Sequence, residues 1–314
     1  MASGNKKVVY AALVGNALIA VTKFVAAAWT GSSAMLSEGI HSLVDTGNQG
    51  LLLYGMRRAA RPADREHPFG HAQELYFWAF VVAILIFALG GGISIYEGIA
   101  KIREPHAVEA VHVSYIVLGL AFLFEAAALW AAWRAFQRTR RGRGMMEALR
   151  GSKDPAIFTV LVEDAAALMG LVIAFIGIFL GQLLDEPRLD GVASVAIGCL
   201  LVATAVFLAR ETRSLLTGEA ASNEVIAGLR EVMNEHPGIT GSREVMTMHL
   251  GPEEVLVAAN LGFAPSLDAG EVEETVAGLE RRIREAFPQV RHLFIEAQAL
   301  RRHRPGAADA NGPR

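Results

Sequence analysis

Cysteine is nearly absent from this sequence, in which Cys199 is the single one among 314 residues. A lone cysteine excludes an internal disulfide framework and a cysteine-rich zinc cluster. Charge is also sparse, since only 19% of the residues are Asp, Glu, Lys or Arg and the formal net charge is −3. A balance so close to neutral gives no reason to expect a nucleic-acid partner.

Apolar residues are abundant and make up 53% of the chain. They concentrate between Val8 and Leu208 in blocks long enough to cross a bilayer, whereas the C-terminal part has shorter apolar runs and regularly spaced charges. A soluble enzyme of this length usually carries more charge and spreads its apolar residues over short amphipathic runs. The sequence therefore predicts a membrane domain followed by a small soluble domain.

Six segments approach the roughly 20 apolar residues that a bilayer core requires. Because lipid offers the backbone no hydrogen bonds, each segment is expected to be a helix. The first segment is too long for the apolar core of a signal peptide and is expected to remain a membrane helix. The segments are Val8–Trp29, Ser33–Met56, Leu75–Tyr96, Val113–Phe136, Ile157–Leu184 and Val192–Ala209.

Lysine and arginine positions predict the orientation of these segments. Basic residues cluster before the first segment, between the second and third, and between the fourth and fifth, whereas the opposite connections carry few. Basic loops of membrane proteins remain in the cytoplasm. Both termini are therefore expected in the cytoplasm. Since no transit peptide is evident, we expect a multi-pass protein of the plasma membrane or a bacterial inner membrane.

The C-terminal part shows an α-β-β-α-β order, which is typical of a ferredoxin-like sandwich. The expected elements are Asn223–Glu235, Ser242–Leu250, Val255–Phe263, Ala269–Ala286 and Val290–Ala297. The fold class is therefore an all-α six-helix membrane domain at 1–213 joined to a cytoplasmic α+β ferredoxin-like domain at 214–300. A basic tail rich in Pro, Gly and Ala, 301–314, is expected to be disordered.

The second segment contains three ionisable residues, Glu38, His41 and Asp45. Charges at membrane depth are costly, so they need a reason. His41 and Asp45 are four residues apart and share a helix face, where a neutral imidazole and a carboxylate can both ligate Zn²⁺. The alternative is a polar contact or salt bridge between helices. The one competing buried cation, Lys23, is expected to extend toward the interface, so a ligand pair is favoured.

Two further groups of residues are candidate ligands. Glu163 and Asp164 form an acidic pair in the fifth segment, although a polar contact with another helix is the alternative. The loop after the second segment contains Asp64, His67 and His71 in the pattern D-x-x-H-x-x-x-H. Their spacing fits either a second metal site or an exposed set that binds nothing.

The runs SEGIHSLVDTGNQ and HPFGHAQELYFW resemble the cation diffusion facilitator family of metal transporters, and the resemblance covers almost the whole chain. It implies a homodimer whose transport site uses His41, Asp45 and Asp164. It also implies a second metal site in some relatives at the loop residues Asp64, His67 and His71.

One departure from the family pattern concerns the fourth ligand. Val160 occupies the position of the family's histidine in the fifth segment, as in the zinc transporter 9-like branch. Glu163 is the obvious replacement; a water molecule or Asn16 is an alternative, and Glu38 is a possible accessory residue. Oxygen ligands in place of an imidazole favour harder metals such as Mn²⁺ or Fe²⁺.

The resemblance implies a secondary transporter that exports a divalent metal, zinc above all, from the cytoplasm in exchange for protons by alternating access. The metal is the substrate, and no prosthetic group and no enzymatic activity are expected. Three alternatives stay open: a carrier whose main substrate is Mn²⁺ or Fe²⁺, a membrane metal sensor or scaffold, and an intramembrane metalloenzyme. Against the last, the sequence has no HExxH motif.

Overall fold

The computed structural model describes residues 3–139 and 155–297, and the chain divides into two compact units, Met1–Thr217 and Gly218–Arg314. We call them unit 1 and unit 2. The tail at 301–314, for which disorder is predicted, lies outside the described residues.

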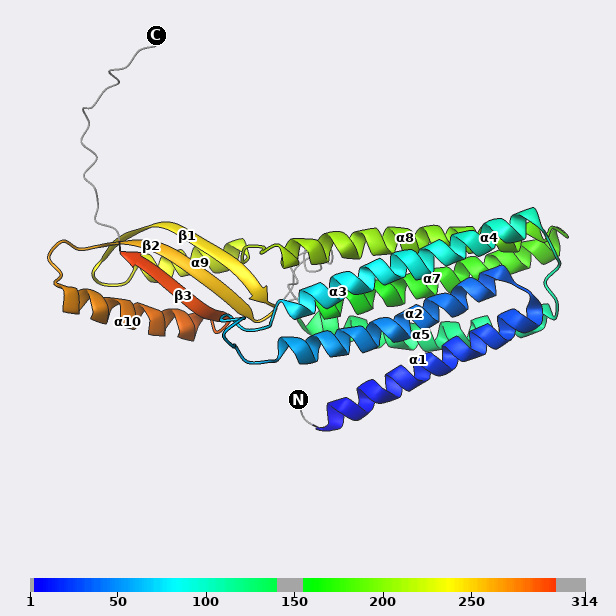
Figure 1. Cartoon of the computed structure of the whole chain (residues 1–314), viewed down its shortest axis with the longest axis horizontal. Helices are drawn as coiled ribbons and strands as arrows, with labels where there is room; N and C mark the ends of the chain where they lie inside the picture. The colour runs from blue at the N-terminus through cyan, green and yellow to red at the C-terminus, as the bar shows by residue number, and fades with distance from the viewer. Residues whose placement is uncertain (1–2, 140–154, 298–314) are drawn as a thin grey trace, which may run out of the picture. The chain divides into compact units, whose positions relative to one another are not determined.

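Unit 1 is built from long helices that lie roughly side by side (Figure 1). Four of its helical stretches are long and apolar enough to cross a membrane, so unit 1 is an integral membrane domain. Those stretches are Glu74–Arg103, Val111–Arg134, Phe158–Leu183 and Arg188–Leu216. The elements in chain order are α1 (Ser3–Thr30), α2 (Ser33–Ala59), α3 (Glu74–Leu85), η1 (Ile86–Gly92), α4 (Ile93–Arg103), α5 (Val111–Thr139), α7 (Pro155–Leu183) and α8 (Arg188–Leu216).

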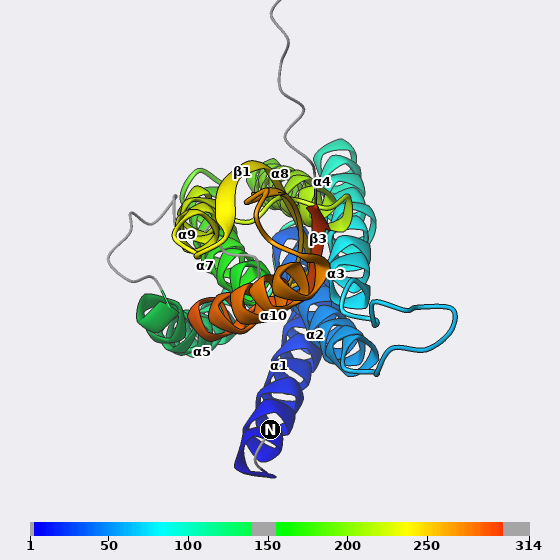
Figure 2. The ribbon, with the colours of Figure 1, turned by 90° about the vertical axis from the view of Figure 1, so that its left-hand side faces the viewer.

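Helix α1 packs against α2 and α5, and its N-terminal end diverges from the other helices (Figure 1 and Figure 2). Helix α2 has 27 residues and lies centrally, since it contacts α1, α3, α4, α7 and α8. Buried polar residues follow one side of α2. This central position makes α2 the helix on which the candidate site is assembled.

The third predicted segment is a helix with a π-helical turn at η1, which the sequence pattern does not predict. Close approach to α8 accompanies this turn. A Cβ atom added to Gly98 would lie 2.6 Å from the carbonyl oxygen of Gly191, and one added to Gly198 would lie 3.0 Å from that of Gly91. Glycines allow two membrane helices to meet backbone to backbone in this way. Single-turn π segments inside α-helices are often found at functional sites.

Asp190 of α8 ties one end of the bundle together. Its buried carboxylate accepts hydrogen bonds from Ser32 Oγ at 2.5 Å and from the backbone amide of Ser33 at 2.7 Å, at the N-terminus of α2. Lys101 Nζ lies 3.9 Å from the same carboxylate and donates to the carbonyl oxygen of Gly31 at 2.7 Å. A carboxylate here satisfies donors that a helix N-terminus leaves unpaired and complements its dipole.

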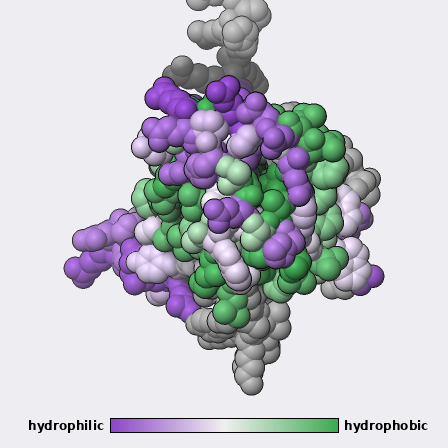
Figure 3. Space-filling view, turned by 90° about the vertical axis from the view of Figure 1, so that its right-hand side faces the viewer, coloured by the Kyte–Doolittle hydropathy of each residue, from purple (hydrophilic) through white to green (hydrophobic). Residues whose placement is uncertain are grey.

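The same end of unit 1 faces the viewer in Figure 3, where hydrophilic side chains gather between hydrophobic flanks. Exposed charged residues at this end lie in the α4–α5 and α7–α8 connections: Arg103, Glu104, Glu109, Asp185, Glu186 and Arg188. Polar ends and apolar sides are the surface that a bilayer requires.

Unit 2 contains α9 (Asn223–Asn234), β1 (Ile239–Gly251), β2 (Glu254–Phe263), α10 (Ala269–Ala286) and β3 (Val290–Ala297). Its sheet has the order β1-β2-β3, with β1 antiparallel to β2 and β2 parallel to β3. The alternate residues of β2 from Val255 to Leu261 are buried with apolar residues of α9 and α10. The order of elements is the predicted one, and β1 begins at Ile239, before the predicted Ser242.

Asp190→Ala should lower the free energy of unfolding of the detergent-solubilised protein by about 3 kcal/mol, because buried donors of α2 and the Lys101 ammonium lose their acceptor. Chemical unfolding followed by circular dichroism measures the change. The control Glu104→Ala removes an exposed carboxylate in the α4–α5 connection and should change stability by less than about 0.5 kcal/mol. An Asp190→Ala protein as stable as its parent would contradict this role.

Candidate metal centres

One face of α2 carries four polar residues in a row: Glu38, His41, Asp45 and Asn48. Their spacing of three, four and three residues places them on a single stripe of the helix. Glu38, His41 and Asn48 are buried, and the side chain of Asp45 is 13% exposed. The stripe is therefore shielded from solvent along its whole length.

His41 and Asp45 lie one helical turn apart and face each other. His41 Nδ1 is 3.4 Å from Asp45 Oδ1. Within the described residues, the two ring nitrogens of His41 and this oxygen of Asp45 have no hydrogen-bond partner. A buried polar atom without a partner costs about 1–3 kcal/mol. Such atoms can act as ligands, and one metal cation can be bound by an imidazole nitrogen and a carboxylate oxygen together.

Helix α7 packs against α2 and brings its acidic pair toward the same region. The carboxylate of Glu163 is buried and accepts a hydrogen bond from Asn48 Nδ2 at 2.8 Å, while Asn48 Oδ1 has no partner within the described residues. Asp164 is half-buried, and its charge interacts with that of Asp45. Val160 is also half-buried and offers no ligand atom.

The residues predicted for the transport site thus meet on α2 and α7, but they do not form a closed ligand shell. Among the residues that the structure describes, one group of three or more candidate ligands has its atoms within 4.8 Å of one another, and it is the loop group. Asn16 lies on α1, half-buried, and within the described part of the chain it makes no hydrogen bond or ion pair to this region. The residues predicted for the transport site therefore form an open arrangement.

The expectation for Lys23 is wrong. Lys23 does not extend toward the interface: it is fully buried, its Nζ lies 3.0 Å from Glu38 Oε2, and it donates to Ser42 Oγ at 2.8 Å. Glu38 therefore has a cationic partner, contrary to the premise that the acidic residues of α2 lack one. The reason is packing, since the face of α1 that carries Lys23 lies against α2.

Glu125 of α5 is a further acidic residue of this region that the sequence reasoning missed. It is 7% exposed and lies on the buried stripe of α5 that also carries Leu118 and Ala121. Its charge interacts with those of Asp45 and Asp164. The available signal was a single acidic residue in the apolar run LAFLFEAAALW.

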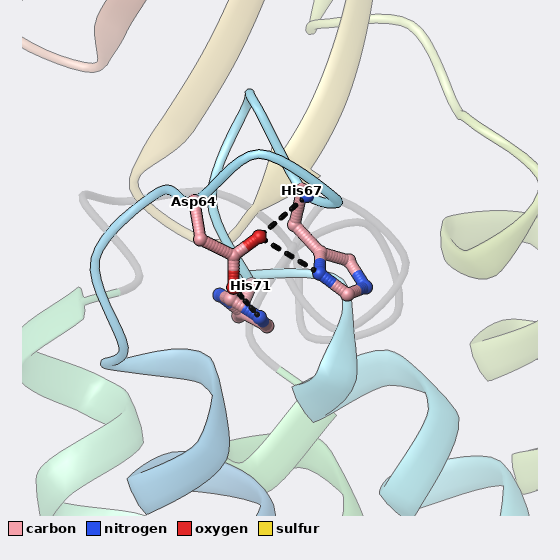
Figure 4. A group of neighbouring side chains, drawn as sticks. All are labelled: Asp64, His67 and His71. Atoms are coloured by element: carbon pink, nitrogen blue, oxygen red, sulfur yellow. Dashed lines mark hydrogen bonds and ion pairs between the residues drawn. The ribbon is translucent and has the colours of Figure 1, made fainter.

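The loop between α2 and α3 brings Asp64, His67 and His71 together (Figure 4). Asp64 Oδ1 lies 3.3 Å from His67 Nδ1, and Asp64 Oδ2 lies 3.5 Å from His71 Nε2. Tetrahedral zinc with bonds of about 2.0 Å separates its ligand atoms by about 3.3 Å. These donor separations are compatible with one bound Zn²⁺, with His71 buried and the other two residues exposed.

Local contacts hold this loop in shape. Asp64 Oδ1 accepts from the backbone amides of Glu66 at 3.0 Å and His67 at 2.7 Å, which closes a tight turn. Arg58 at the end of α2 donates to Glu74 Oε1 at the start of α3, at 2.7 Å from Nη2 and 3.1 Å from Nε. The two flanking helices are therefore joined beside the group of ligands.

Residues 9–217 match the Cation efflux transmembrane domain family. The proton-coupled zinc antiporter SLC30A9, mitochondrial, of Homo sapiens is 32% identical over 262 residues, which cover 83% of this chain and 46% of that protein. The metal tolerance protein C4 of Arabidopsis thaliana is 28% identical over 262 residues, 82% of this chain and 57% of that protein. The chain therefore spans about half the length of these two relatives.

A bacterial relative matches along most of its length. The cation-efflux pump FieF of Pectobacterium atrosepticum is 26% identical over 278 residues, which cover 87% of this chain and 86% of that protein. These similarities therefore extend beyond the transmembrane match into unit 2.

The pKa of Asp64 should lie below its ordinary value, because the backbone amide of His67 above all, and then the His67 ring and the Glu66 amide, stabilise the carboxylate. Carboxyl-carbon NMR against pH measures the midpoint. With the folded pKa lowered, the contribution of Asp64 to loop stability is present above the ordinary pKa of about 3.9. It is lost as the pH falls through the folded pKa.

His67→Ala provides the control for this titration, because it removes the ring but keeps the backbone amide. We expect most of the lowering to remain in that variant. A midpoint at or above the ordinary value in the parent protein would contradict the turn geometry.

Proposed function

This chain belongs to the cation efflux family, and from that premise we propose that it is a secondary transporter that carries a divalent transition metal, zinc first, out of the cytoplasm in exchange for protons. The observation that carries the proposal is the stripe on α2. Buried, unpartnered atoms of His41 and Asp45 face a helix that carries Glu163 and Asp164. A site with several carboxylates, and with ligand atoms that have no hydrogen-bond partner in the protein, suits a cation that enters and leaves.

We propose that the metal is held by His41, Asp45, Asp164 and Glu163, with Glu163 in the place that Val160 cannot fill. Metal ligation requires deprotonated groups, so protons compete with the metal for the same side chains. Entry from one side, loss of water in the site and release by protons on the other side together make an antiport cycle. The open arrangement of the ligands fits a state before the metal has drawn them together.

Similarity to a relative named as a zinc antiporter makes zinc the first candidate, whereas the donor set keeps Mn²⁺ and Fe²⁺ as alternatives. The proposed set of one imidazole and three carboxylates has more oxygen ligands than zinc sites built from several nitrogen or sulfur ligands. Oxygen ligands favour harder ions. The printed name of the human relative is that of a zinc antiporter. Both considerations are weighed by the transport experiment below.

The finer architecture also belongs to the proposal. Helices α1 and α2 complete a set of six spans, both termini lie in the cytoplasm, and the membrane is the plasma membrane or a bacterial inner membrane. Unit 2 is a ferredoxin-like domain that pairs with a second copy of the chain. Exposed apolar residues on its sheet support such a homodimer: Met246 of β1 is 56% exposed and Phe294 of β3 is 52% exposed, and both pair with Ala258 of the intervening strand β2.

Asp45→Ala should abolish uptake of Zn²⁺ into proteoliposomes, because the site loses the carboxylate that lies beside His41. The assay compares Zn²⁺, Mn²⁺, Fe²⁺, Co²⁺ and Cd²⁺ with and without an imposed pH gradient. Uptake of one metal that requires both the gradient and Asp45 supports a proton-coupled carrier and identifies its substrate.

The matched control is Asp185→Asn, which removes an exposed carboxylate at a positive φ of 53° that asparagine tolerates. It should transport at the parental rate. Metal binding without uptake would instead favour a sensor or scaffold, which is the second candidate because the loop group is the one compact ligand cluster among the described residues.

The loop group should bind a second metal ion. Calorimetric titration of the Asp45→Ala protein with Zn²⁺ should leave one site per chain, and adding Asp64→Asn and His71→Ala should remove it, because the loop then loses two of its three ligands. The result to the contrary is an unchanged stoichiometry after the loop substitutions, which would make Asp64, His67 and His71 a non-binding set.

A further inference from the structure

Lys23 occupies a position that the transport chemistry has not yet explained. Its ammonium is fully buried between α1 and α2, bound to Glu38 Oε2 at 3.0 Å and to Ser42 Oγ at 2.8 Å. Ser42 directly follows His41, and Glu38 lies one turn before it on the same stripe. The ammonium therefore lies next to the proposed metal site and not at the membrane surface.

The space around Glu38 is built for this pair. Helix α7 has Gly170 opposite the Glu38 carboxylate, and a Cβ atom there would overlap Glu38 Oε1. The same oxygen has no hydrogen-bond partner within the described residues. The Lys23–Glu38 pair thus fills a gap between α1, α2 and α7 but leaves one carboxylate oxygen available.

The charge of Lys23 acts beyond its direct partner. It interacts electrostatically with His41, Asp45 and Glu125. Five acidic residues converge on this interior, namely Glu38, Asp45, Glu125, Glu163 and Asp164. Within the described residues, the other buried lysine, Lys101, is bound to Asp190 and Gly31 at the end of the bundle.

We propose that Lys23 is a fixed counter-cation of the transport site and determines how tightly the site holds a divalent metal. Its ammonium and the cargo neutralise the same group of buried carboxylates, so Lys23 weakens the binding of a second cation and permits its release. The inference rests on the proposed function, because it assigns Lys23 a role at the site of His41 and Asp45.

A structural role alone is a poor explanation for this pair. A buried ion pair loses so much hydration that apolar residues of similar volume often stabilise a fold equally well or better. An ion pair that only joined α1 to α2 would have no reason to lie beside unpartnered ligand atoms. A counter-cation has to lie there, because its effect on metal affinity falls with distance.

The test measures Zn²⁺ affinity by calorimetry in lipid nanodiscs, in the full chain with Asp64→Asn and His71→Ala so that the loop does not contribute. Lys23→Met should lower the Kd for Zn²⁺ about tenfold or more, since removing a nearby unit charge in a low-dielectric interior changes affinity by this order. Lys23→Gln also removes the charge but keeps a donor for Ser42, and should do the same. Transport turnover in proteoliposomes should fall in both variants, because release slows.

Two controls separate charge from packing. Lys23→Met combined with Glu38→Gln removes one charge of each sign and should return the Kd toward the parental value. Lys101→Met removes the matched buried lysine at the end of the bundle and should not tighten Zn²⁺ binding. Weaker or unchanged binding in both folded Lys23 single variants would overturn the inference.

The same titration distinguishes this failure from failure of the proposed function. Asp45→Ala, added to the chain that already carries Asp64→Asn and His71→Ala, should abolish Zn²⁺ binding. If it does, and the Lys23 variants bind as the parent does, only the counter-cation role is wrong. If Asp45→Ala binds Zn²⁺ normally, the transport site itself is misassigned and the Lys23 inference is overturned with it.

Discussion

The interior of a helix bundle in a membrane offers no water to a charged side chain. Every buried charge of unit 1 must therefore have its partner in the protein or in a bound ion. The apolar side chains of the bundle carry no charge and need no such partner. The face of α2 differs, because Glu38, His41, Asp45 and Asn48 concentrate polar atoms along one buried stripe. The arrangement of the neighbouring helices follows from how these atoms are satisfied or left unsatisfied.

The stripe divides into parts with different partners. At one end, Glu38 is held by Lys23, and at the other, Asn48 donates to Glu163. Between them, His41 and Asp45 keep atoms without partners. The satisfied contacts join α2 to α1 and α7 and so position the unsatisfied ones. A carrier needs this combination, because a site that is rigid and fully paired has nothing left with which to bind its cargo.

The two ends of α2 show how the fold supports such a site. One end is capped by the buried carboxylate of Asp190, which fixes the helix start against α8. The other end continues into the loop that contains Asp64, His67 and His71. The Arg58–Glu74 ion pair joins the two helices that flank this loop. A candidate metal group therefore lies at the end of the same helix that carries the proposed membrane site. Metal ligands on a loop that is closed by local hydrogen bonds need little reorganisation to bind.

The sequence by itself determined the elements that depend on local pattern: the apolar helices, the αββαβ order of unit 2, the i, i+4 pair of His41 and Asp45, and the compact loop group. These follow from hydrophobic period and short spacing, which a chain carries within itself. Only the tertiary structure decided which charges meet across helices. It paired Lys23 with Glu38, brought Glu125 toward Asp45, and placed the π segment η1 beside α8, where Gly91 and Gly198 meet. Such contacts depend on the rotation of each helix about its axis, and packing sets that rotation.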